Sequence, residues 1–417
     1  MSRSLEVTAI FGGIGGLELG LHRSGHRTTL FCECDREATA VLRRHFEGVP
    51  IVSDINCIEE VLGCVSPSSN LLTAGFPCTD LSQAGRTQGF AGGRSSLIRK
   101  TIALLEQRRF AHVLIENVPN WRHLHRGEYM SEVLSELERL KYRWAYRTID
   151  ALAFGLPQRR RRIFVYATAL EGGGDPRDVL FHGNFPAEKS LHGLHEAAHG
   201  FYWTEGNRGL GWGEDCVPTL KGGSTISIPS PPAILMPDLS VITPHLQDAE
   251  RLQGFPAGWT DADSQIQVQG TQQFNQRRRW VLVGNAVNVE VSTWIGERLA
   301  NLMPYEGDRG TPLIPGDPWP EAAWYDGSTR YAASIGTRPV DRPRQRLANF
   351  LHHPGTPLSL RATDGFYRRI DKSRLRLKDG FKDAIKVHLE KMRGAAIVSL
   401  PATPKAPESA VLSLSTS

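Results

Sequence analysis

The sequence lacks any long hydrophobic run. No stretch approaches the roughly 18 consecutive apolar residues of a membrane-spanning helix. The N-terminal residues MSRSLEV contain no apolar segment of a secretory signal. We therefore expect a protein that has no membrane partner and stays in the cytoplasm. The chain also has no internal repeats.

Cysteine is scarce, with six among 417 residues, and no two of them form a CxxC pair. Free thiols in a reducing compartment are the simplest account of this usage. The 14 histidines include no HExxH sequence and no clustered Cys and His spacing. We therefore expect no zinc site and no structural metal.

Hydrophobic residues make up 40% and charged residues 22% of the chain, which is long enough for a real core and two or three domains. Positive charge is unevenly distributed. Residues 338–393 contain 15 Lys and Arg against 6 Asp and Glu, which gives this segment +9 and leaves −4 for the rest of a chain whose total is +5. Such a block can bind nucleic-acid phosphates, although a solvated basic surface is the alternative.

The first 170 residues alternate short apolar or β-branched runs with segments of helical periodicity. The runs predict strands at 5–11, 28–33, 51–54, 71–76, 112–117 and 162–167. Helical spacing predicts helices at 36–46, 95–108 and 128–140, and again at 248–255 and 286–302. This order is typical of an α/β fold with a mostly parallel sheet and helices on both faces.

The composition changes after this region. Residues 171–245 are rich in Gly, Pro, Ser and Thr with little periodicity, which indicates a separate irregular module. A Pro- and Gly-rich connector follows Pro304. The last residues, SLPATPKAPESAVLSLSTS, contain too few large apolar side chains to fold alone.

A glycine-rich stretch, FGGIGG at 11–16, follows the first predicted strand. Glycines there let the backbone turn sharply and approach a ligand at the carboxyl edge of the sheet. Glu18 stands where a GxGxxG sequence would have its third glycine, which disfavours a nicotinamide cofactor. Glu33 and Asp54 end the next two strands, where they could accept hydrogen bonds from a ribose and an adenine, although strand-end caps are the simpler interpretation of either alone.

Cys78 follows the fourth strand on the same edge, within GFPCTDLSQAG. A cysteine is often a small buried hydrophobe. Here Pro77 restricts the backbone before it, and a Gly-, Ser- and Arg-rich stretch after it has the composition of a lid whose arginines would lower the pKa of the thiol. Glu116, in ENV at the end of the fifth strand, could act as an acid toward a ring nitrogen.

Four successive arginines, 159–162, lead into the last of these strands. Alternate residues of a strand point to opposite sides, so Arg160 and Arg162 share one side and Arg159 and Arg161 the other. One pair could face the active site while the other faces solvent or a phosphate.

Together these motifs resemble the DNA cytosine-5 methyltransferase family of bacterial type. The resemblance rests on FGGIGGLELG, GFPCTDLSQAG, ENV, PQRRRRIF, DAERLQGFP and GNAV in this order, and it spans about residues 5–302. It implies a Rossmann-like sheet that binds S-adenosylmethionine, with S-adenosylhomocysteine as product, and a smaller irregular target-recognition domain.

The resemblance also implies the site residues. The catalytic group is Cys78 as nucleophile, Glu116 at the N3 and amino edge of cytosine, and Arg160 and Arg162, the latter at O2. The cofactor-binding residues are Phe11, Gly12, Gly13, Ile14, Gly15, Gly16, Leu17, Glu33, Cys34, Asp54, Ile55, Phe76, Pro77, Leu97, Asn285, Ala286 and Val287. The DNA-binding residues are Ser82, Gln83, Arg86, Arg94, Thr219, Leu220 and Lys221. Thr79 and Cys34 depart from the family's usual glutamine and large apolar residue, which puts only loop and adenine contacts in doubt.

The implied organisation has four parts: a catalytic domain at 1–170 completed by 271–302, a target-recognition region at 171–270, a basic extension at 303–393, and a disordered tail at 394–417. We expect a monomer that binds double-stranded DNA near the bacterial nucleoid, with a restriction or phage-defence system as a possible functional partner. An RNA methyltransferase of the same family and a catalytically inactive DNA-binding relative are the alternatives. The length of the region from 171 to 245 favours DNA, and the intact Cys78, Glu116 and Arg162 argue against inactivity.

Overall fold

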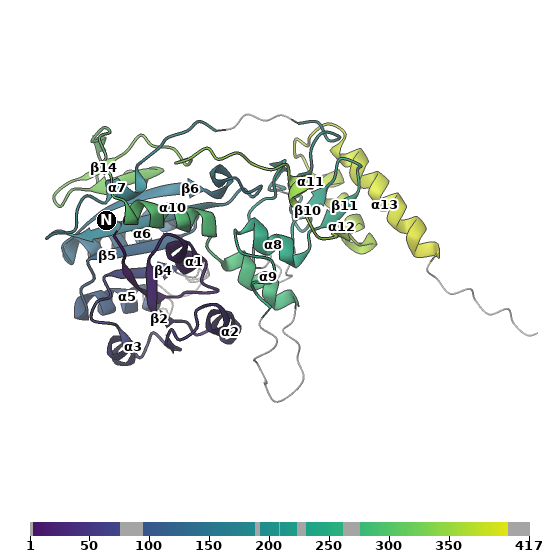
Figure 1. Ribbon diagram of the computed structural model, residues 1–417. Helices are drawn as coiled ribbons and strands as arrows, with labels where there is room; N and C mark the ends of the chain where they lie inside the picture. Colours follow the sequence, from purple (N-terminus) through teal and green to yellow (C-terminus); the bar gives the residue numbers. More distant parts are fainter. Residues whose placement is uncertain are drawn as a thin grey trace, which may run out of the picture.

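The computed structural model describes residues 3–75, 95–187, 192–207, 209–222, 231–261 and 276–398. Within them the chain forms a large and a small sheet with a group of helices between them (Figure 1). The chain runs from the large sheet to the small sheet and back, and its last described helices lie at the small sheet.

The large sheet has the strand order β12-β14-β13-β6-β7-β5-β4-β1-β2-β3. Its strands are β1 (Glu6–Ile10), β2 (Arg27–Cys32), β3 (Ile51–Val52), β4 (Leu71–Gly75), β5 (His112–Asn117), β6 (Tyr142–Asp150), β7 (Arg161–Ala169), β12 (Thr311–Pro312), β13 (Ala322–Tyr325) and β14 (Arg330–Ala332). All six strands predicted from the sequence form, and all six lie in this sheet.

Only one half of the large sheet is parallel. The strands from β3 to β5 pair in parallel, whereas every pair from β5 to β12 is antiparallel. The expectation of a mostly parallel sheet is therefore wrong for the second half. The reason is β6, a strand that the sequence analysis did not predict. Residues 151–160 alone connect it to β7, and this is too short for the crossover of about a dozen residues or more that parallel strands need.

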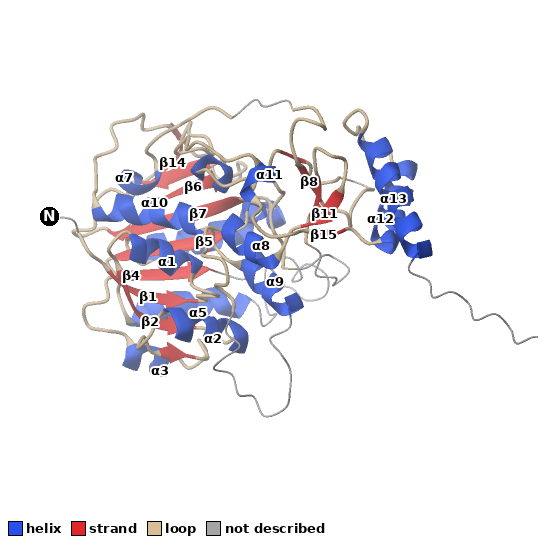
Figure 2. Cartoon of the chain, turned by 45° about the vertical axis from the view of Figure 1, so that its right-hand side comes forward, coloured by secondary structure: helices blue, strands red, loops and turns tan. Residues whose placement is uncertain are grey.

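Helices cover both faces of the large sheet (Figure 2). One core layer contains side chains of α1 (Gly16–Arg23), α7 (Arg177–Leu180) and α10 (Val289–Ala300). The other contains side chains of α3 (Ile58–Cys64), α5 (Ser95–Gln107) and α6 (Glu128–Arg139). The helix α2 (Arg36–His45) follows β2, and short 3-10 helices form at η1 (Pro119–Arg122), η2 (Leu124–Gly127) and η3 (Ala151–Phe154).

The small sheet is antiparallel, with the order β15-β11-β10-β8-β9. Its strands are β8 (His199–Phe201), β9 (Gly213–Glu214), β10 (Ala233–Leu235), β11 (Val241–Thr243) and β15 (Thr356–Pro357). The helices around it are α8 (Leu246–Leu252), α9 (Gln276–Asn285), α11 (Leu347–Phe350), α12 (Leu360–Lys372) and α13 (Phe381–Val398). The region expected to be irregular thus supplies four of the five strands.

The residues predicted as one basic extension, 303–393, do not form a unit of their own. Their first part adds β12, β13 and β14 to the edge of the large sheet, where β13 pairs with β6. Their last part adds β15, α12 and α13 to the small sheet, where Phe366 and Phe381 pack around Phe201. The helix α13 also continues to Val398, past the start predicted for the tail, and residues 399–417 lie outside the described residues.

Candidate active site

The glycine-rich stretch forms a tight loop between β1 and α1. Phe11, Gly13 and Gly15 all have a positive φ, of 57°, 55° and 79°. A Cβ added to Gly13 would have no atom within 4 Å, whereas one added to Gly15 would lie 2.6 Å from the ring of Phe46. Gly15 therefore allows close packing beneath the loop, while Gly13 keeps its open side free for a ligand. We call residues 11–16 the cofactor loop.

The two predicted nucleoside acids lie at neighbouring strand ends. Glu33 accepts the N–H groups of Gly13 and Asp35, both at 2.8 Å, so it ties the cofactor loop to the start of α2. Burial raises the pKa of Glu33 above its ordinary value, although these hydrogen bonds lower it. Asp54 accepts the backbone N–H of Asn56 at 2.8 Å and is exposed. Both acids thus lie at adjacent strand ends of the large sheet, where the sequence analysis expected them.

The other predicted cofactor residues divide into lining and supporting side chains. Cys34 is exposed, and Leu97 is half-buried against the same core layer as Phe11. Ile14, Leu17 and Ile55 are buried, so their side chains support the site rather than line it.

The segment from Asn285 to Val287 lies against the cofactor loop, about 270 residues away in the sequence. A Cβ added to Gly16 would lie 2.3 Å from the carbonyl oxygen of Val287. Only glycine at this position allows such an approach. The Asn285 side chain lies beside Gly222, because a Cβ on Gly222 would be 2.5 Å from its Oδ1. We call residues 219–222 the recognition strip, after the role predicted for them from the sequence.

The buried Glu116 and the half-buried Arg162 form an ion pair at the end of β5, with Nε of Arg162 3.0 Å from Oε1 of Glu116. Burial raises the pKa of Glu116 above its ordinary value, against the lowering effect of Arg162 and Arg160. Gly75, the last residue of β4, pairs with Glu116 in the sheet, and a Cβ there would lie 4.0 Å from Oε2 of Glu116. The chain that follows Gly75 therefore starts beside this carboxyl group.

The arginine run alternates as the strand period predicts. Arg160 is buried and Arg162 pairs with Glu116, whereas Arg161 is exposed and pairs with Asp150 at 3.4 Å. Arg160 donates to the carbonyl oxygens of Leu220, Gly284 and Ala286 at 2.6 to 3.3 Å. Its guanidinium group thus links the start of β7 to Leu220 and to residues 284–286, and these bonds occupy both of the terminal nitrogens that a substrate would need.

The predicted recognition residues Thr219, Leu220 and Lys221 lie next to this junction. Thr219 donates its hydroxyl to the carbonyl of Arg159 at 2.9 Å, and the side chain of Leu220 is buried. Lys221 projects outward, with Nζ 3.7 Å from the ring centroid of Tyr202. Of the three, Lys221 alone has an exposed side chain, and its Nζ also pairs with Oε1 of Glu205 at 2.8 Å.

Several predicted site residues lie outside the described residues: Phe76, Pro77, Cys78, Ser82, Gln83, Arg86 and Arg94. In the part of the chain that is described, no cluster of three or more His, Cys, Asp or Glu side chains could hold a metal ion. None of the helices in the described segments combines the length and apolar character needed to cross a bilayer.

Sequence reasoning missed three residues around the site. Gln158 is buried and donates to the carbonyl of Leu252 at 2.8 Å, and the PQRRRR motif that contains it was the available signal. Trp259 contacts the cofactor loop, but nothing in its sequence context indicated this. Glu18 was noted only as a departure from GxGxxG, yet its carboxyl is buried beneath the loop and accepts a hydrogen bond from Thr73 at 2.8 Å.

The fold and the arrangement of the predicted site residues are those of a methyltransferase-type α/β enzyme, with a large mixed sheet and a separate small antiparallel sheet. The model of the C-5 cytosine-specific DNA methylase family matches residues 5–188. A bacterial relative, Type II methyltransferase M2.BsuMI of Bacillus subtilis (strain 168), is 45% identical over 379 residues, 88% of this chain and 93% of its own length. The chain therefore belongs to the C-5 cytosine-specific DNA methylase family.

More distant similarity agrees. Type II methyltransferase M.SsoII of Shigella sonnei is 28% identical over 70% of this chain and 79% of its own. The crystal structure of the S. pombe Dnmt2 methyltransferase has the same fold, with a TM-score of 0.52 and 15% identity over 71% of this chain and 98% of its own. The protein is thus a DNA (cytosine-5-)-methyltransferase with S-adenosylmethionine as methyl donor, as the sequence predicted.

Proposed function

We propose that the protein methylates a flipped cytosine within one specific duplex sequence, that Cys78 is its nucleophile, and that it is the modification partner of a type II restriction system. The last part is supported by the name of the Bacillus subtilis relative, a Type II methyltransferase. The catalytic part is supported by one observation above all. The ion pair of the buried Glu116 with the half-buried Arg162 lies directly beside the end of β4, from which the chain continues toward Cys78.

The reaction requires this combination of groups. Cytosine C5 is a poor nucleophile until a thiolate adds to C6, because the electron pair released into the ring makes C5 an enamine carbon. A bound methyl donor would supply its methyl group to C5 and be left as a thioether, and loss of the C5 proton and of the thiolate would then restore the ring. A neutral Glu116 could donate its proton toward N3 during addition, and its raised pKa favours that form. Arg162 would bind O2.

The residues of the cofactor edge fit S-adenosylmethionine. The open side of Gly13 lets the backbone approach a ligand closely, and Glu33 holds that side in place. We assign the ribose to Glu33, the adenine amino group to Asp54, and the methionine part to the cofactor loop. When bound, the cofactor supplies an electrophilic methyl group.

We assign recognition of the target sequence to residues 171–270. The assignment is supported by the separate small sheet and by the position of Lys221, which lies on the exposed side of the strip that Arg160 fastens to the catalytic sheet. A duplex hides C6, so the base must leave the stack at a cost of a few kcal/mol. Ser82, Gln83, Arg86 and Arg94 would contact the DNA around the flipped base.

A target duplex that carries 5-fluorocytosine tests this proposal. Fluorine cannot leave C5 as a cation, so enzyme and DNA should remain covalently joined in the presence of S-adenosylmethionine and resist denaturant on a gel. Cys78→Ala should abolish the joined species, with Cys216→Ala as a matched control. If Cys78→Ala still traps DNA, the nucleophile is misassigned. If fluorinated RNA traps and duplex DNA does not, the substrate is RNA, and an inactive relative would trap neither.

Bisulfite sequencing of DNA from a host that expresses the protein identifies the target. Methylation should appear at one cytosine of a single short sequence. Methylation scattered over unrelated sequences would contradict the assignment of a specific duplex target, and a genome without new methylation would contradict the activity in that host.

A further inference from the structure

The turn after α8 is held rigidly by one buried carboxyl group. Glu250 accepts the backbone N–H groups of Gly258 at 2.6 Å and Thr260 at 2.9 Å. Arg279 of α9 lies 3.3 Å from the same carboxylate and donates its Nε to the Thr260 hydroxyl at 2.8 Å. Because Glu250 is fully buried and paired, residues 254–260 have a fixed conformation. We call them the bridging turn.

Trp259 projects from the bridging turn to the cofactor loop. Its indole Nε1–H donates to the carbonyl oxygen of Ile14 at 2.9 Å. The ring of His45 stacks on the indole, with centroids 3.5 Å apart and planes 6° apart, and its Nε2 donates to the Trp259 carbonyl at 2.7 Å. Phe255 packs against the indole with its centroid 5.2 Å away. These contacts with His45 and Phe255 fix the orientation of the indole ring that donates to the cofactor loop.

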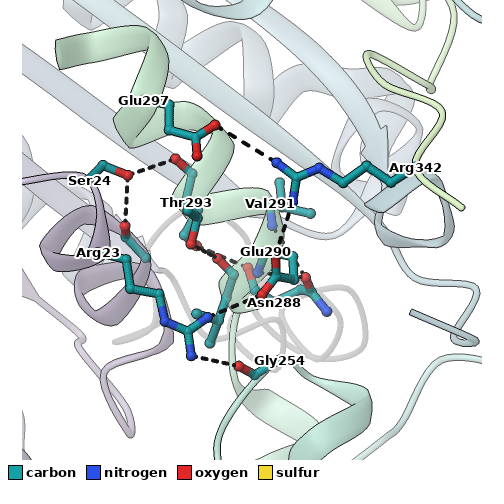
Figure 3. A network of polar contacts seen from close by, with 12 residues as sticks. Arg23, Ser24, Gly254, Asn288, Glu290, Val291, Thr293, Glu297 and Arg342 are labelled. Atoms are coloured by element: carbon teal, nitrogen blue, oxygen red, sulfur yellow. Dashed lines mark hydrogen bonds and ion pairs between the residues drawn. The ribbon is translucent and has the colours of Figure 1, made fainter. Parts of the chain in front are cut away.

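The far end of α1 is fastened to the same part of the chain (Figure 3). Arg23 donates to the carbonyl of Gly254 at 3.2 Å and pairs with Glu290 of α10 at 3.1 Å. The hydroxyl of Ser24 donates to the carbonyl of Thr293, also on α10, at 2.9 Å. The helix that starts at the cofactor loop is thus tied to the bridging turn at both of its ends.

The bridging turn is also connected to the recognition strip. Gln158 donates to the carbonyl of Leu252 at 2.8 Å and to the side chain of Gln253 at 3.1 Å, just before the turn. The same Gln158 accepts the N–H of Leu220 at 3.2 Å. A continuous series of hydrogen bonds therefore leads from Leu220 to the residues that carry Trp259.

We propose that Trp259 is a positioning residue that holds the cofactor loop in the conformation that binds S-adenosylmethionine. Ile14 lies between Gly13 and Gly15, whose backbones can adopt many conformations, and the indole fixes the carbonyl between them. The proposal rests on the assignment of the cofactor to this loop under the proposed function. Through Gln158, the same turn links the loop to the recognition region.

The substitution Trp259→Phe tests the proposal, because it keeps an aromatic ring against His45 and removes the donor. The dissociation constant for S-adenosylmethionine, measured by calorimetry on the full chain without DNA, should rise about five- to tenfold, the range of one lost hydrogen bond. KM for the cofactor should rise with it, while kcat at saturating cofactor and the affinity for DNA stay within about twofold. A purely structural role would change all of these quantities together or none.

Two further variants keep the outcomes distinct. Trp294→Phe changes a similarly buried tryptophan, on α10 against Phe154, and should leave cofactor affinity unchanged. Glu33→Gln should weaken cofactor binding, and if it does not, the cofactor assignment fails independently of Trp259.

If Trp259→Phe binds the cofactor as tightly as the wild type, the proposal is overturned. If that variant does not fold, Thr260→Val loosens the turn instead, and unchanged cofactor affinity in it overturns the proposal equally.

Discussion

Glu18 should make the stability of this enzyme depend on pH. The residue lies in the first turn of α1 with 2% of its surface exposed, and one carboxyl oxygen accepts the hydroxyl of Thr73 at 2.8 Å. The other oxygen, Oε2, is buried with no hydrogen-bond partner among the described residues. Burial raises the pKa of Glu18 from 4.5 to about 7, and the nearby charge of Glu33 adds to the rise, while the Thr73 hydrogen bond opposes it.

The direction in which stability changes with pH depends on which state, folded or unfolded, binds the Glu18 proton more tightly. The folded state holds the Glu18 proton up to about pH 7, whereas the unfolded state releases it near pH 4.5. The contribution to stability is therefore fully present below pH 4.5 and is lost as pH rises through 7. A pKa difference of about 2.5 corresponds to about 3 kcal/mol, of which about 2 kcal/mol is lost between about pH 5 and about pH 7.5.

Urea denaturation followed by tryptophan fluorescence at several pH values between about 5 and about 7.5 measures this contribution. Other groups titrate in the same range. The informative quantity is therefore the free energy of unfolding of the wild type minus that of Glu18→Gln, at each pH. The free energy of unfolding of the wild type should fall by about 2 kcal/mol relative to the variant over this range. Thr73→Val removes a hydrogen bond to the ionised form and should move the loss to higher pH. Parallel curves for wild type and Glu18→Gln would refute the assignment.

Three further predictions address the site and the basic segment 338–393. Glu116→Gln should lower methyl transfer about 100-fold or more while calorimetry shows intact cofactor binding, and near-normal turnover would remove Glu116 from the mechanism. Replacing the exposed Arg374, Arg376 and Lys386 with glutamine should flatten the salt dependence of DNA binding in gel shifts, with the slope reduced by about 0.9 for each phosphate that the variant no longer neutralises. An unchanged slope would mean that these three side chains form a solvated surface that does not bind DNA. The target sequence of the variant should equal that of the wild type in either case. Arg160→Met leaves several buried carbonyls unpaired and should cost about 3 kcal/mol or more in urea denaturation, whereas a cost below about 1 kcal/mol would contradict its joining role.

Point substitutions are the right test of the basic segment because the structure rules out a simple truncation. A chain that ends after residue 330 would lose most of β14 and all of α12 and α13. Phe366, Ile370 and Ile385 of these helices pack in the core of the small sheet with Phe201. Such a truncation would remove part of the core of the small sheet together with the positive charge.

The sequence by itself determined the chemistry of the enzyme and the first half of its sheet. Local periodicity predicts strands such as β1 and β5 because each buries apolar side chains on both faces. Phe11 follows β1 and Glu116 lies near the end of β5. Parallel strands end at one edge of a sheet, so the order of these motifs along the chain was enough to place them at the same edge. The roles assigned to Cys78 and its neighbours remain predictions.

Only the tertiary structure decided the interactions that depend on distant segments. No local pattern shows that β13 would pair with β6, because pairing between strands so far apart is set by the packing of the whole sheet. The same holds for the burial that raises the pKa of Glu18, and for the approach of Trp259 to Ile14 across 245 positions. A residue's type fixes which hydrogen bonds it can make, but its burial and its partners are properties of the folded chain, and these decide its pKa and its role.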